Sequence, residues 1–289
     1  MEERYAVAIV GSGPAGLSAA INARIRNKKL IVFGSKDLSN KIVKAPMVNN
    51  YLGFPEIPGE ELRNKFQEHM DSMDIQVVHE RINAIYAMGD YFVLMVNEKA
   101  YEATSVIIAT GMEYTKPLKG EEEFLGKGVG YCATCDAPLY KGKTVTIIGY
   151  NRDAEEEANY VAELSGKLYY IPLYEGEYEL SSNIEIIKDK PVEIVGQELV
   201  QKLVLKNTEI ATDGIFIMKD SVSPGQLVPG IKMEDGHIWV NRDLSTNIKG
   251  CYAAGDCIGK PYQFIKAAGE GQAAALNAVL YLNNLRTGN

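Results

Sequence analysis

Two cysteines separated by two residues and followed at once by an acid are the residues of this sequence best suited to chemistry. Cys132, Cys135 and Asp136 lie in the stretch Gly-Tyr-Cys-Ala-Thr-Cys-Asp. Two thiols at this spacing can close a small disulfide ring, and the neighbouring carboxyl group can deliver and remove the protons that thiol–disulfide exchange requires. The spacing therefore indicates electron transfer through a dithiol.

Half of a zinc site is the alternative interpretation of this pair, and it needs two further ligands at similarly tight spacing. The other two cysteines, Cys251 and Cys257, are separated by five residues, and none of the three histidines is paired with another candidate ligand at metal-site spacing. We therefore expect no metal site. We interpret Cys251 and Cys257 as small buried residues.

A glycine-rich turn follows the first apolar stretch of the chain. Residues 4–10 are predicted to form a buried parallel strand, and a helical pattern extends from the turn to about residue 26. Between them, Gly11 permits a tight turn, Gly13 lets the backbone approach a pyrophosphate, and Gly16 lets helix and strand pack closely. The order of strand, glycine turn and helix predicts a dinucleotide-binding site.

The second predicted strand, residues 30–33, is followed by Gly34 and Ser35 instead of the acid that usually holds a dinucleotide ribose. We expect Ser35 or a backbone group to bind the ribose instead. Residues 36–58 form a long connection, and connections of this length usually have a function. The first domain continues with a predicted amphipathic helix at 59–73 and predicted strands at 75–78, 81–87, 91–96, 99–102 and 106–111.

A second unit of strand, turn and helix lies at residues 144–165, but it lacks the chemistry of a nucleotide site. Its turn, residues 149–154, keeps one of the three fingerprint glycines, and three consecutive glutamates follow it in the first helical turn. The next predicted strand, residues 167–171, leads into an acidic stretch without an arginine for a 2′-phosphate. We interpret this unit, with a meander near 184–217, as a degenerate nucleotide-binding scaffold.

Composition and charge narrow the possible classes of protein. The 289 residues are 46% hydrophobic and 24% charged, and no apolar run is long enough to span a membrane. The acidic N-terminus is neither a signal nor a transit peptide, so we expect a cytoplasmic protein without a membrane partner. Residues 113–242 hold 14 Lys and Arg against 22 Asp and Glu, which accounts for the whole net charge of −8. This distribution argues against a nucleic-acid partner.

The last segment is predicted to return to the first domain. Residues 250–256 indicate a short strand that ends in the acidic turn Gly255-Asp256, and a helical pattern covers 261–285. The sequence thus predicts an α/β fold with two Rossmann-like domains of the FAD/NAD(P)-binding type, the second inserted into the first. The expected boundaries are 1–112 with 243–289 for the first domain and 113–242 for the second, with a charged linker at 113–128.

In this order the motifs resemble those of low-molecular-weight thioredoxin reductases along nearly the whole chain. The resemblance rests on the glycine turn, the 49–53 loop, residues 109–111, the dithiol, and Gly255-Asp256 with the helix behind it. It implies a homodimer that binds FAD in the discontinuous first domain and carries the dithiol in the inserted one. The expected FAD-binding residues are Gly11, Ser12, Gly13, Pro14, Ala15, Gly16, Gly34, Ser35, Lys41, Asn50, Ala109, Thr110, Gly111, Gly255, Asp256, Gln263 and Phe264.

The resemblance also implies a role for each reactive residue. Cys135 would be the thiol beside the flavin, Cys132 the thiol that attacks thioredoxin, and Asp136 the proton donor. Asp256 would hold the ribitol or phosphate region of FAD. The Arg-Gln-Ala flavin contact of the family is replaced here by residues 262–264, Tyr-Gln-Phe.

The degenerate second nucleotide site points to a narrower group, the ferredoxin-dependent flavin thioredoxin reductases of anaerobic bacteria. We therefore expect electrons to pass from reduced ferredoxin through FAD and the dithiol to thioredoxin. The alternatives are an FAD-dependent dithiol oxidase, an NADPH-dependent thioredoxin reductase with a divergent nucleotide site, and a non-enzymatic flavin redox sensor.

Two further expectations concern the whole molecule. An acidic ferredoxin is expected to dock on the neutral first domain, where four lysines lie in stretches without acid, namely Lys41, Lys44, Lys260 and Lys266. The second domain is expected to change its orientation about 113–128 and 241–249, because a disulfide against the flavin cannot also be presented to a partner protein.

Overall fold

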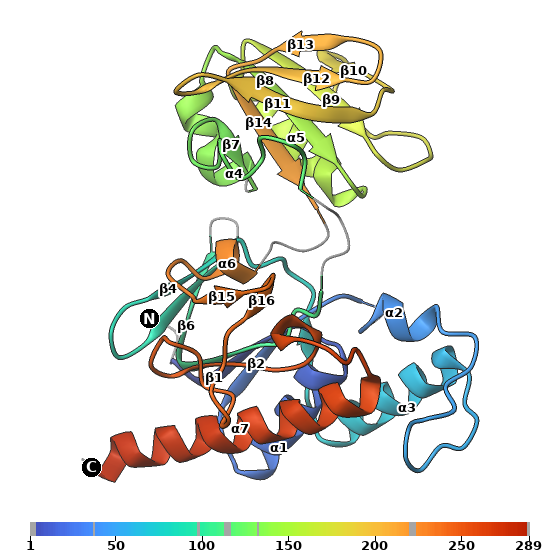
Figure 1. Cartoon of the computed structure of the whole chain (residues 1–289), viewed down its shortest axis with the longest axis vertical. Helices are drawn as coiled ribbons and strands as arrows, with labels where there is room; N and C mark the ends of the chain where they lie inside the picture. The colour runs from blue at the N-terminus through green and yellow to red at the C-terminus, as the bar shows by residue number, and fades with distance from the viewer. Residues whose placement is uncertain are drawn as a thin grey trace. The chain divides into compact units, whose positions relative to one another are not determined.

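The computed structural model describes residues 4–36, 38–96, 99–112, 117–131, 133–219 and 224–287 (Figure 1). It consists of two compact units, which we call unit 1 (Met1–Met112 with Ser223–Asn289) and unit 2 (Glu113–Val222). The predicted α/β class and the insertion of the second unit into the first are confirmed. The chain returns to unit 1 at residue 223, however, and not at the expected 243.

Three short elements explain this difference in the boundary. Helix α6 (Pro224–Leu227) contacts strand β4 of unit 1, and a hairpin follows, formed by β15 (Met233–Glu234) and β16 (His237–Ile238). Ile238 is buried, and β16 contacts the turn that begins at Asp256. Each element has only two to four residues, too few for a periodic pattern that would assign it to either unit.

Unit 1 is built on a seven-stranded sheet in the order β3-β2-β1-β6-β5-β4, with β17 also paired to β6. Five of its strands are parallel, and two, β4 and β5, add an antiparallel edge. The bounds are β1 Tyr5–Val10, β2 Leu30–Phe33, β3 Val77–Val78, β4 Ala84–Ala87, β5 Phe92–Val96, β6 Lys99–Ile108 and β17 Cys251–Ala253.

The structure has a single strand, β6, where the sequence predicted two separate strands at 99–102 and 106–111. Its first half pairs with β5, and its second half pairs with β1 and β17. The first half is partly exposed and the second half is buried, so the polarity changes within one strand. That change gave the appearance of two elements.

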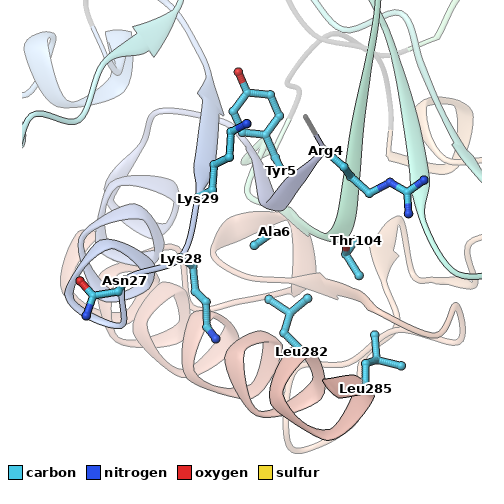
Figure 2. A pocket seen from close by; sticks show the side chains of 9 residues that line it. All are labelled: Arg4, Tyr5, Ala6, Asn27, Lys28, Lys29, Thr104, Leu282 and Leu285. Atoms are coloured by element: carbon cyan, nitrogen blue, oxygen red, sulfur yellow. The ribbon is translucent and has the colours of Figure 1, made fainter. Parts of the chain in front are cut away.

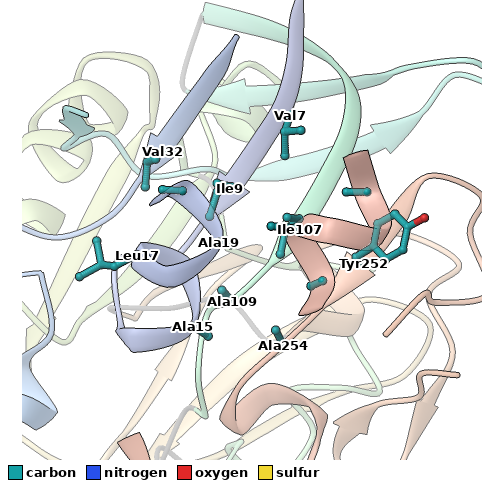
Figure 3. Packing of buried hydrophobic residues seen from close by; sticks show 14 of the residues in the cluster. Val7, Ile9, Ala15, Leu17, Ala19, Val32, Ile107, Ala109, Tyr252 and Ala254 are labelled. Carbon is teal, nitrogen blue, oxygen red and sulfur yellow. The ribbon is translucent and has the colours of Figure 1, made fainter. Parts of the chain in front are cut away.

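Two helices pack together over this sheet and fix the glycine turn. Helix α1 (Pro14–Ile25) lies against α7 (Phe264–Thr287), and both bury alanines that allow close approach (Figure 1). A Cβ at Gly271 of α7 would lie 1.9 Å from the carbonyl oxygen of Ala15. Figure 3 shows the core beneath them, where Val7, Ile9 and Ile107 project from the strands. Helices α2 (Asn40–Val43) and α3 (Gly59–Ser72) enclose a smaller apolar cluster.

Unit 2 has a five-stranded parallel sheet in the order β10-β9-β8-β14-β7. One face packs against helix α5 (Asp153–Leu164), and the other packs against a three-stranded antiparallel sheet. The parallel strands are β7 Val129–Gly130, β8 Thr144–Gly149, β9 Lys167–Pro172, β10 Ile184–Ile186 and β14 Gly214–Met218, and the antiparallel strands are β11 Pro191–Gly196, β12 Val200–Leu205 and β13 Glu209–Ala211.

The segment expected to be a linker belongs largely to unit 2. Phe124 is buried in the cluster beneath the antiparallel sheet, and Glu121 is 1% exposed. The interpretation of residues 117–128 as a linker is therefore wrong. Phe124 belongs to the core of unit 2, and the charged residue Glu121 is buried and forms an ion pair. Within the described ranges, no helix is both long and apolar enough to cross a membrane.

Candidate functional site

The glycine turn after β1 has the geometry that a bound pyrophosphate requires. Gly11 has a φ of 119°, and a Cβ there would lie 2.1 Å from the carbonyl oxygen of Ala109. A Cβ at Gly16 would lie 1.8 Å from the carbonyl oxygen of Gly11, so this glycine permits the close packing of helix on strand. Gly13 differs, because a Cβ there would meet nothing within 4 Å. Gly13 therefore leaves its backbone open to a ligand at the N-terminus of α1.

The buried hydroxyl of Ser12 links this turn to the segment after β2. Its Oγ donates a hydrogen bond to the carbonyl oxygen of Leu38 at 2.6 Å and accepts one from the backbone N–H of Ser35 at 3.0 Å. A Cβ at Gly34 would lie 2.1 Å from that oxygen, which explains the glycine. The structure therefore places Ser12, Gly34 and Ser35 together, with the Ser12 hydroxyl bonded within the protein.

The acidic turn after β17 lies near the C-terminal end of β6, because these two strands are paired. Asp256 lies 3.1 Å from the Nζ of Lys41, which is itself close to Gly111. Gly255 has a φ of 88°, and its N–H donates a hydrogen bond to Glu270 on α7 at 3.0 Å. The structure thus brings together residues 41, 111 and 256, which are far apart in the sequence.

Lys266 and Glu270 are functional candidates that the sequence analysis did not identify in these roles. Lys266 lies 3.1 Å from Glu270 and donates a hydrogen bond to the carbonyl oxygen of Gly259 at 2.7 Å. Burial raises the pKa of Glu270, while its bond from Lys266 acts in the opposite direction. The available signal was their spacing of four residues on a predicted helix. Together they fix the turn that presents Asp256.

The residues expected near the isoalloxazine each contact other side chains of unit 1. Asn50 donates a hydrogen bond to the side-chain oxygen of Gln263 at 2.6 Å. Phe264 packs against the cluster of α2 and α3. The Tyr262 hydroxyl is 2.7 Å from Nε2 of His237 on β16.

These residues fit the pyrophosphate and ribitol of a dinucleotide cofactor. The open backbone at Gly13 and the helix N-terminus behind it suit phosphate oxygens. Thr110 at the end of β6 has a buried hydroxyl oxygen with no hydrogen-bond partner among the described residues. A buried polar atom without a partner is uncommon in a native protein and is consistent with a missing ligand.

A hollow at the opposite edge of the unit 1 sheet is separate from this site. It has a volume of about 370 Å³ and lies at the N-terminal ends of β1 and β2. Figure 2 shows Arg4 on one side, Lys28 and Lys29 on the other, and Leu282 and Leu285 of α7 beside them. Arg4 is already paired with Glu102 at 3.0 Å, and Lys28 is bonded to Asn283. The cations of this hollow are therefore engaged within the protein.

The dithiol segment follows β7 in unit 2. Cys132 lies outside the described residues, and Cys135 belongs to the short helix α4 (Ala133–Asp136). The Asp136 carboxyl group lies at the end of β7, because a Cβ at Gly130 would be 3.0 Å from its Oδ2. Burial raises the pKa of Asp136, which favours its protonated form. A carboxyl group with a raised pKa, one residue after Cys135 in the sequence, suits the predicted role of proton donor.

The two remaining cysteines are unsuited to redox chemistry. Cys251 and Cys257 are fully buried, and neither is in a disulfide. Burial raises the pKa of each thiol to about 12. Because the thiolate is the reactive form, both are inert near neutral pH. The interpretation of these residues as small core side chains is confirmed.

The turn between β8 and α5 is packed closely against the side chains around it. A Cβ at Gly149 would lie 2.3 Å from the hydroxyl of Tyr170. That hydroxyl is 2.9 Å from the hydroxyl of Tyr174, which donates a hydrogen bond to Glu155. The other oxygen of Glu155 accepts a hydrogen bond from the N–H of Glu179 at 2.7 Å. The side chains next to this turn are thus packed and hydrogen-bonded to one another.

The hollow beside this turn has the wrong charge for a phosphorylated nucleotide. It has a volume of about 400 Å³, and its lining contains four carboxylates and one arginine, from Arg152, Asp153, Glu155, Glu156, Asn159 and Glu179. A nucleotide diphosphate would meet repulsion from most of these groups. This acidic lining supports the interpretation of unit 2 as a Rossmann-like domain that does not bind a phosphorylated nucleotide.

The comparisons with known proteins agree with this geometry. Residues 5–171 match the pyridine nucleotide-disulphide oxidoreductase family. The chain is 34% identical to a thioredoxin reductase of Mycoplasma genitalium, over 94% of this chain and 93% of that protein. It is 30% identical to the thioredoxin reductase of Bacillus subtilis, over 99% and 97%.

A solved structure gives a nearer likeness. A ferredoxin-flavin thioredoxin reductase from Clostridium acetobutylicum is 63% identical and superposes with a TM-score of 0.93, over 98% of this chain and 99% of that one. The sequence resemblance and the two-domain FAD/NAD(P)-binding fold are thereby confirmed. This chain therefore belongs to the pyridine nucleotide-disulphide oxidoreductase family, and within it to the thioredoxin reductases, which are FAD-binding disulfide oxidoreductases.

Proposed function

We propose that this enzyme transfers electrons from reduced ferredoxin, through FAD bound in unit 1, to the Cys132–Cys135 disulfide, and from there to thioredoxin. The single observation that supports this choice of donor is the acidic hollow beside the turn between β8 and α5, whose lining holds four carboxylates and one arginine. The likeness to the ferredoxin-flavin enzyme supports the same choice.

Unit 1 supplies the cofactor site in this proposal. Gly11, Gly13 and Gly16 would receive the pyrophosphate, Asp256 and Lys41 the ribitol side, and Asn50 with Gln263 the ring. Bound FAD would accept electrons one at a time and release them in pairs. The protein contributes position and the exclusion of competing reactions.

The dithiol then performs an exchange that balances in electrons and protons. Two electrons and two protons convert the Cys132–Cys135 disulfide to two thiols. Cys132 releases its proton to solvent, and its thiolate attacks the thioredoxin disulfide, so that a mixed disulfide forms while one thioredoxin sulfur leaves as a thiolate. Cys135 attacks the mixed disulfide, which restores the enzyme disulfide and releases reduced thioredoxin. Asp136 would supply the proton that the departing thiolate needs.

Thioredoxin turnover with each possible donor tests this function. Under anaerobic conditions, the enzyme should reduce thioredoxin with reduced ferredoxin and should show no useful rate with NADPH or NADH. Turnover supported equally well by NADPH would assign the enzyme to the nucleotide-dependent reductases. Oxygen consumption with a small dithiol, without a response to ferredoxin, would instead indicate a dithiol oxidase.

The proposal includes a homodimer. Helix α7 leaves Ile265 and Leu280 exposed, at 40% and 57%, although both are apolar side chains in an ordered helix. Single exposed apolar side chains also occur on monomers, so the proposal of a homodimer rests on the resemblance to thioredoxin reductases. Light scattering of the FAD-loaded protein should give twice the monomer mass, and a monomer mass at micromolar concentration would contradict the dimer.

A further inference from the structure

The adenosine ribose of FAD is a part of the cofactor for which this chain lacks the usual residue. In a dinucleotide site an acid at the end of the second strand holds the ribose, and here β2 is followed by Gly34 and Ser35. The backbone groups of Ser35 are already bonded. Its N–H donates to the Ser12 hydroxyl at 3.0 Å, and its carbonyl oxygen accepts from the N–H of Leu38 at 3.1 Å. The ribose hydroxyls therefore need an acceptor that the sequence motif does not supply.

His79 lies at this end of β2 because β3 is the parallel neighbour of β2. Phe33 of β2 is paired with Val78, the last residue of β3, and the N–H of Gly34 donates to the carbonyl oxygen of Val78 at 3.1 Å. His79 directly follows Val78, and its Nδ1 lies 3.3 Å from the carbonyl oxygen of Gly34. The imidazole thus lies next to the position from which the acid is missing.

The segment that carries His79 is anchored by the next residue, Glu80. One oxygen of the Glu80 carboxylate is 2.7 Å from the Nζ of Lys99, and the other accepts a hydrogen bond from the Tyr101 hydroxyl at 2.9 Å. These bonds, the one from Lys99 first, lower the pKa of Glu80. Both donors belong to β6, so this acid is engaged within unit 1 and holds the segment in place.

The contact with Gly34 determines which nitrogen of His79 can accept a hydrogen bond. A carbonyl oxygen only accepts, so Nδ1 carries the hydrogen in the neutral ring and Nε2 has a free lone pair. The side chain is exposed, and its ring makes no other hydrogen bond to the residues that the structure describes. His79 therefore offers one acceptor to a ligand at the end of β2.

We propose that His79 binds the adenosine ribose of FAD, with Nε2 accepting a hydrogen bond from a ribose hydroxyl in place of the missing carboxylate. The inference rests on the proposed placement of the FAD pyrophosphate at the glycine turn, from which the ribose extends toward the end of β2. A neutral imidazole accepts one hydrogen bond, whereas a carboxylate can accept several. The ribose is thus held by a single bond to this side chain.

The test compares FAD with an analogue that lacks both hydroxyls of the adenosine ribose. Fluorescence titration of the FAD-free full chain gives the dissociation constant of each compound, for the wild type and for His79→Leu. Loss of one neutral hydrogen bond should weaken FAD binding about three- to tenfold in the variant. The wild type should bind the analogue more weakly than FAD by a similar factor, and His79→Leu should bind the two compounds equally.

Two further variants serve as controls. His79→Gln keeps an acceptor at about the reach of Nε2 and should retain most of the affinity for FAD and the preference over the analogue. His69→Leu makes the same substitution at an exposed histidine in the last turn of α3. That turn leads into the N-terminal end of β3, at the opposite edge of the sheet, so this variant should bind both compounds like the wild type.

The preference for FAD over the analogue decides the proposal. If His79→Leu weakens the binding of both compounds equally, the residue supports the segment and not the ribose, and the proposal is wrong. It is equally wrong if His79→Leu binds FAD like the wild type, or if the wild type binds the two compounds equally well.

Gly13→Ala distinguishes a failure of this inference from a failure of the proposed FAD site. If Gly13→Ala binds FAD weakly while His79→Leu binds it normally, the site stands and only the role of His79 is lost. If Gly13→Ala binds FAD like the wild type, the placement of the cofactor itself is wrong. Neither measurement requires ferredoxin or thioredoxin, so both are independent of the electron donor.

Discussion

Cys132 and Cys135 have different tasks in the proposed exchange, because one thiol must face the flavin and the other a protein substrate. We expect Cys135→Ser to trap a stable mixed disulfide between Cys132 and thioredoxin, since no second thiol remains to resolve it. Cys132→Ser should form no such adduct. Non-reducing gels and mass spectrometry of the adduct measure this difference, and an adduct through Cys135 would reverse the assignment.

Asp136 gives the exchange a predictable dependence on pH. Burial raises the pKa of this carboxyl, so the acid keeps its proton to a higher pH than an exposed aspartate does. The single-turnover reduction of thioredoxin by the reduced enzyme should slow as the pH rises through this pKa. Asp136→Asn should lose that dependence and be about 10²-fold slower. A variant with the wild-type rate and profile would exclude Asp136 as the proton donor.

At the scale of single residues, the sequence was sufficient to predict residues that lie in one short motif. It was insufficient for residues that only the fold brings together. The dithiol, its acid and the three glycines lie within short motifs, so spacing alone identified them. Glu121 and Lys219 are 98 positions apart, and only the parallel order of β7, β14 and β8 brings them together. A lysine directly after an apolar strand is ordinarily exposed, and its burial could not be predicted from that pattern.

At the scale of elements, a substitution in the glycine turn should affect cofactor binding without affecting folding. Gly13→Ala adds a Cβ that meets nothing within 4 Å of the protein, so the free energy of unfolding of the FAD-free protein should change little. The same Cβ enters the expected phosphate position, and FAD affinity should fall at least about tenfold. Fluorescence titration with FAD measures this affinity.

Gly16→Ala is the matched comparison. Its Cβ would lie 1.8 Å from the carbonyl oxygen of Gly11, so this variant should lose stability even without FAD. Thermal unfolding of both FAD-free variants provides the test. If Gly13→Ala binds FAD like the wild type, the assignment of this turn to the pyrophosphate is wrong.

The elements that the sequence predicted well are long or strictly patterned. The strand at 30–33, the helix at 59–73 and the end of the first helix near residue 26 were placed within two residues of their observed positions. The hairpin of β15 and β16 and helix α6 were not predicted, because two to four residues show no periodicity. They decide the domain boundary, so the error at 243 follows directly from their length. In the meander, β14 leaves the antiparallel strands and joins the parallel sheet, a choice that depends on tertiary packing.

At the scale of the whole molecule, charge is divided between the units. Residues 113–222 hold 12 Lys and Arg against 20 Asp and Glu, so unit 2 carries the entire net charge of −8 within the observed boundary as well. An acidic donor protein would meet repulsion there, and unit 1 is the favoured landing surface. The net charge of each unit follows from the sequence once the boundaries are known.

The structure changes which lysines of unit 1 can test this docking. Lys41 is paired with Asp256 and Lys266 with Glu270, so reversing either would disturb the expected FAD site. Lys44 and Lys260 are exposed. Lys44→Glu with Lys260→Glu should slow flavin reduction by ferredoxin at low salt, and added salt should slow the wild type in the same way.

Two controls accompany this variant. Reduction by dithionite should be unchanged, because it does not require docking. Lys28→Glu with Lys29→Glu makes the same change in charge at the opposite edge of the unit 1 sheet, beside the hollow of Figure 2, and should have a smaller effect. Equal effects of the two double variants would mean that only total charge matters and that the proposed docking face is wrong.

The visible spectrum of the anaerobic, FAD-loaded enzyme tests the central claim most directly. Excess NADPH, and separately NADH, should leave the flavin absorbance unchanged, because the hollow beside the turn between β8 and α5 is lined mainly by carboxylates. Reduced ferredoxin, added next to the same sample, should bleach it within the time of enzymatic turnover. Rapid bleaching by either nucleotide, or no bleaching by reduced ferredoxin, would contradict the account.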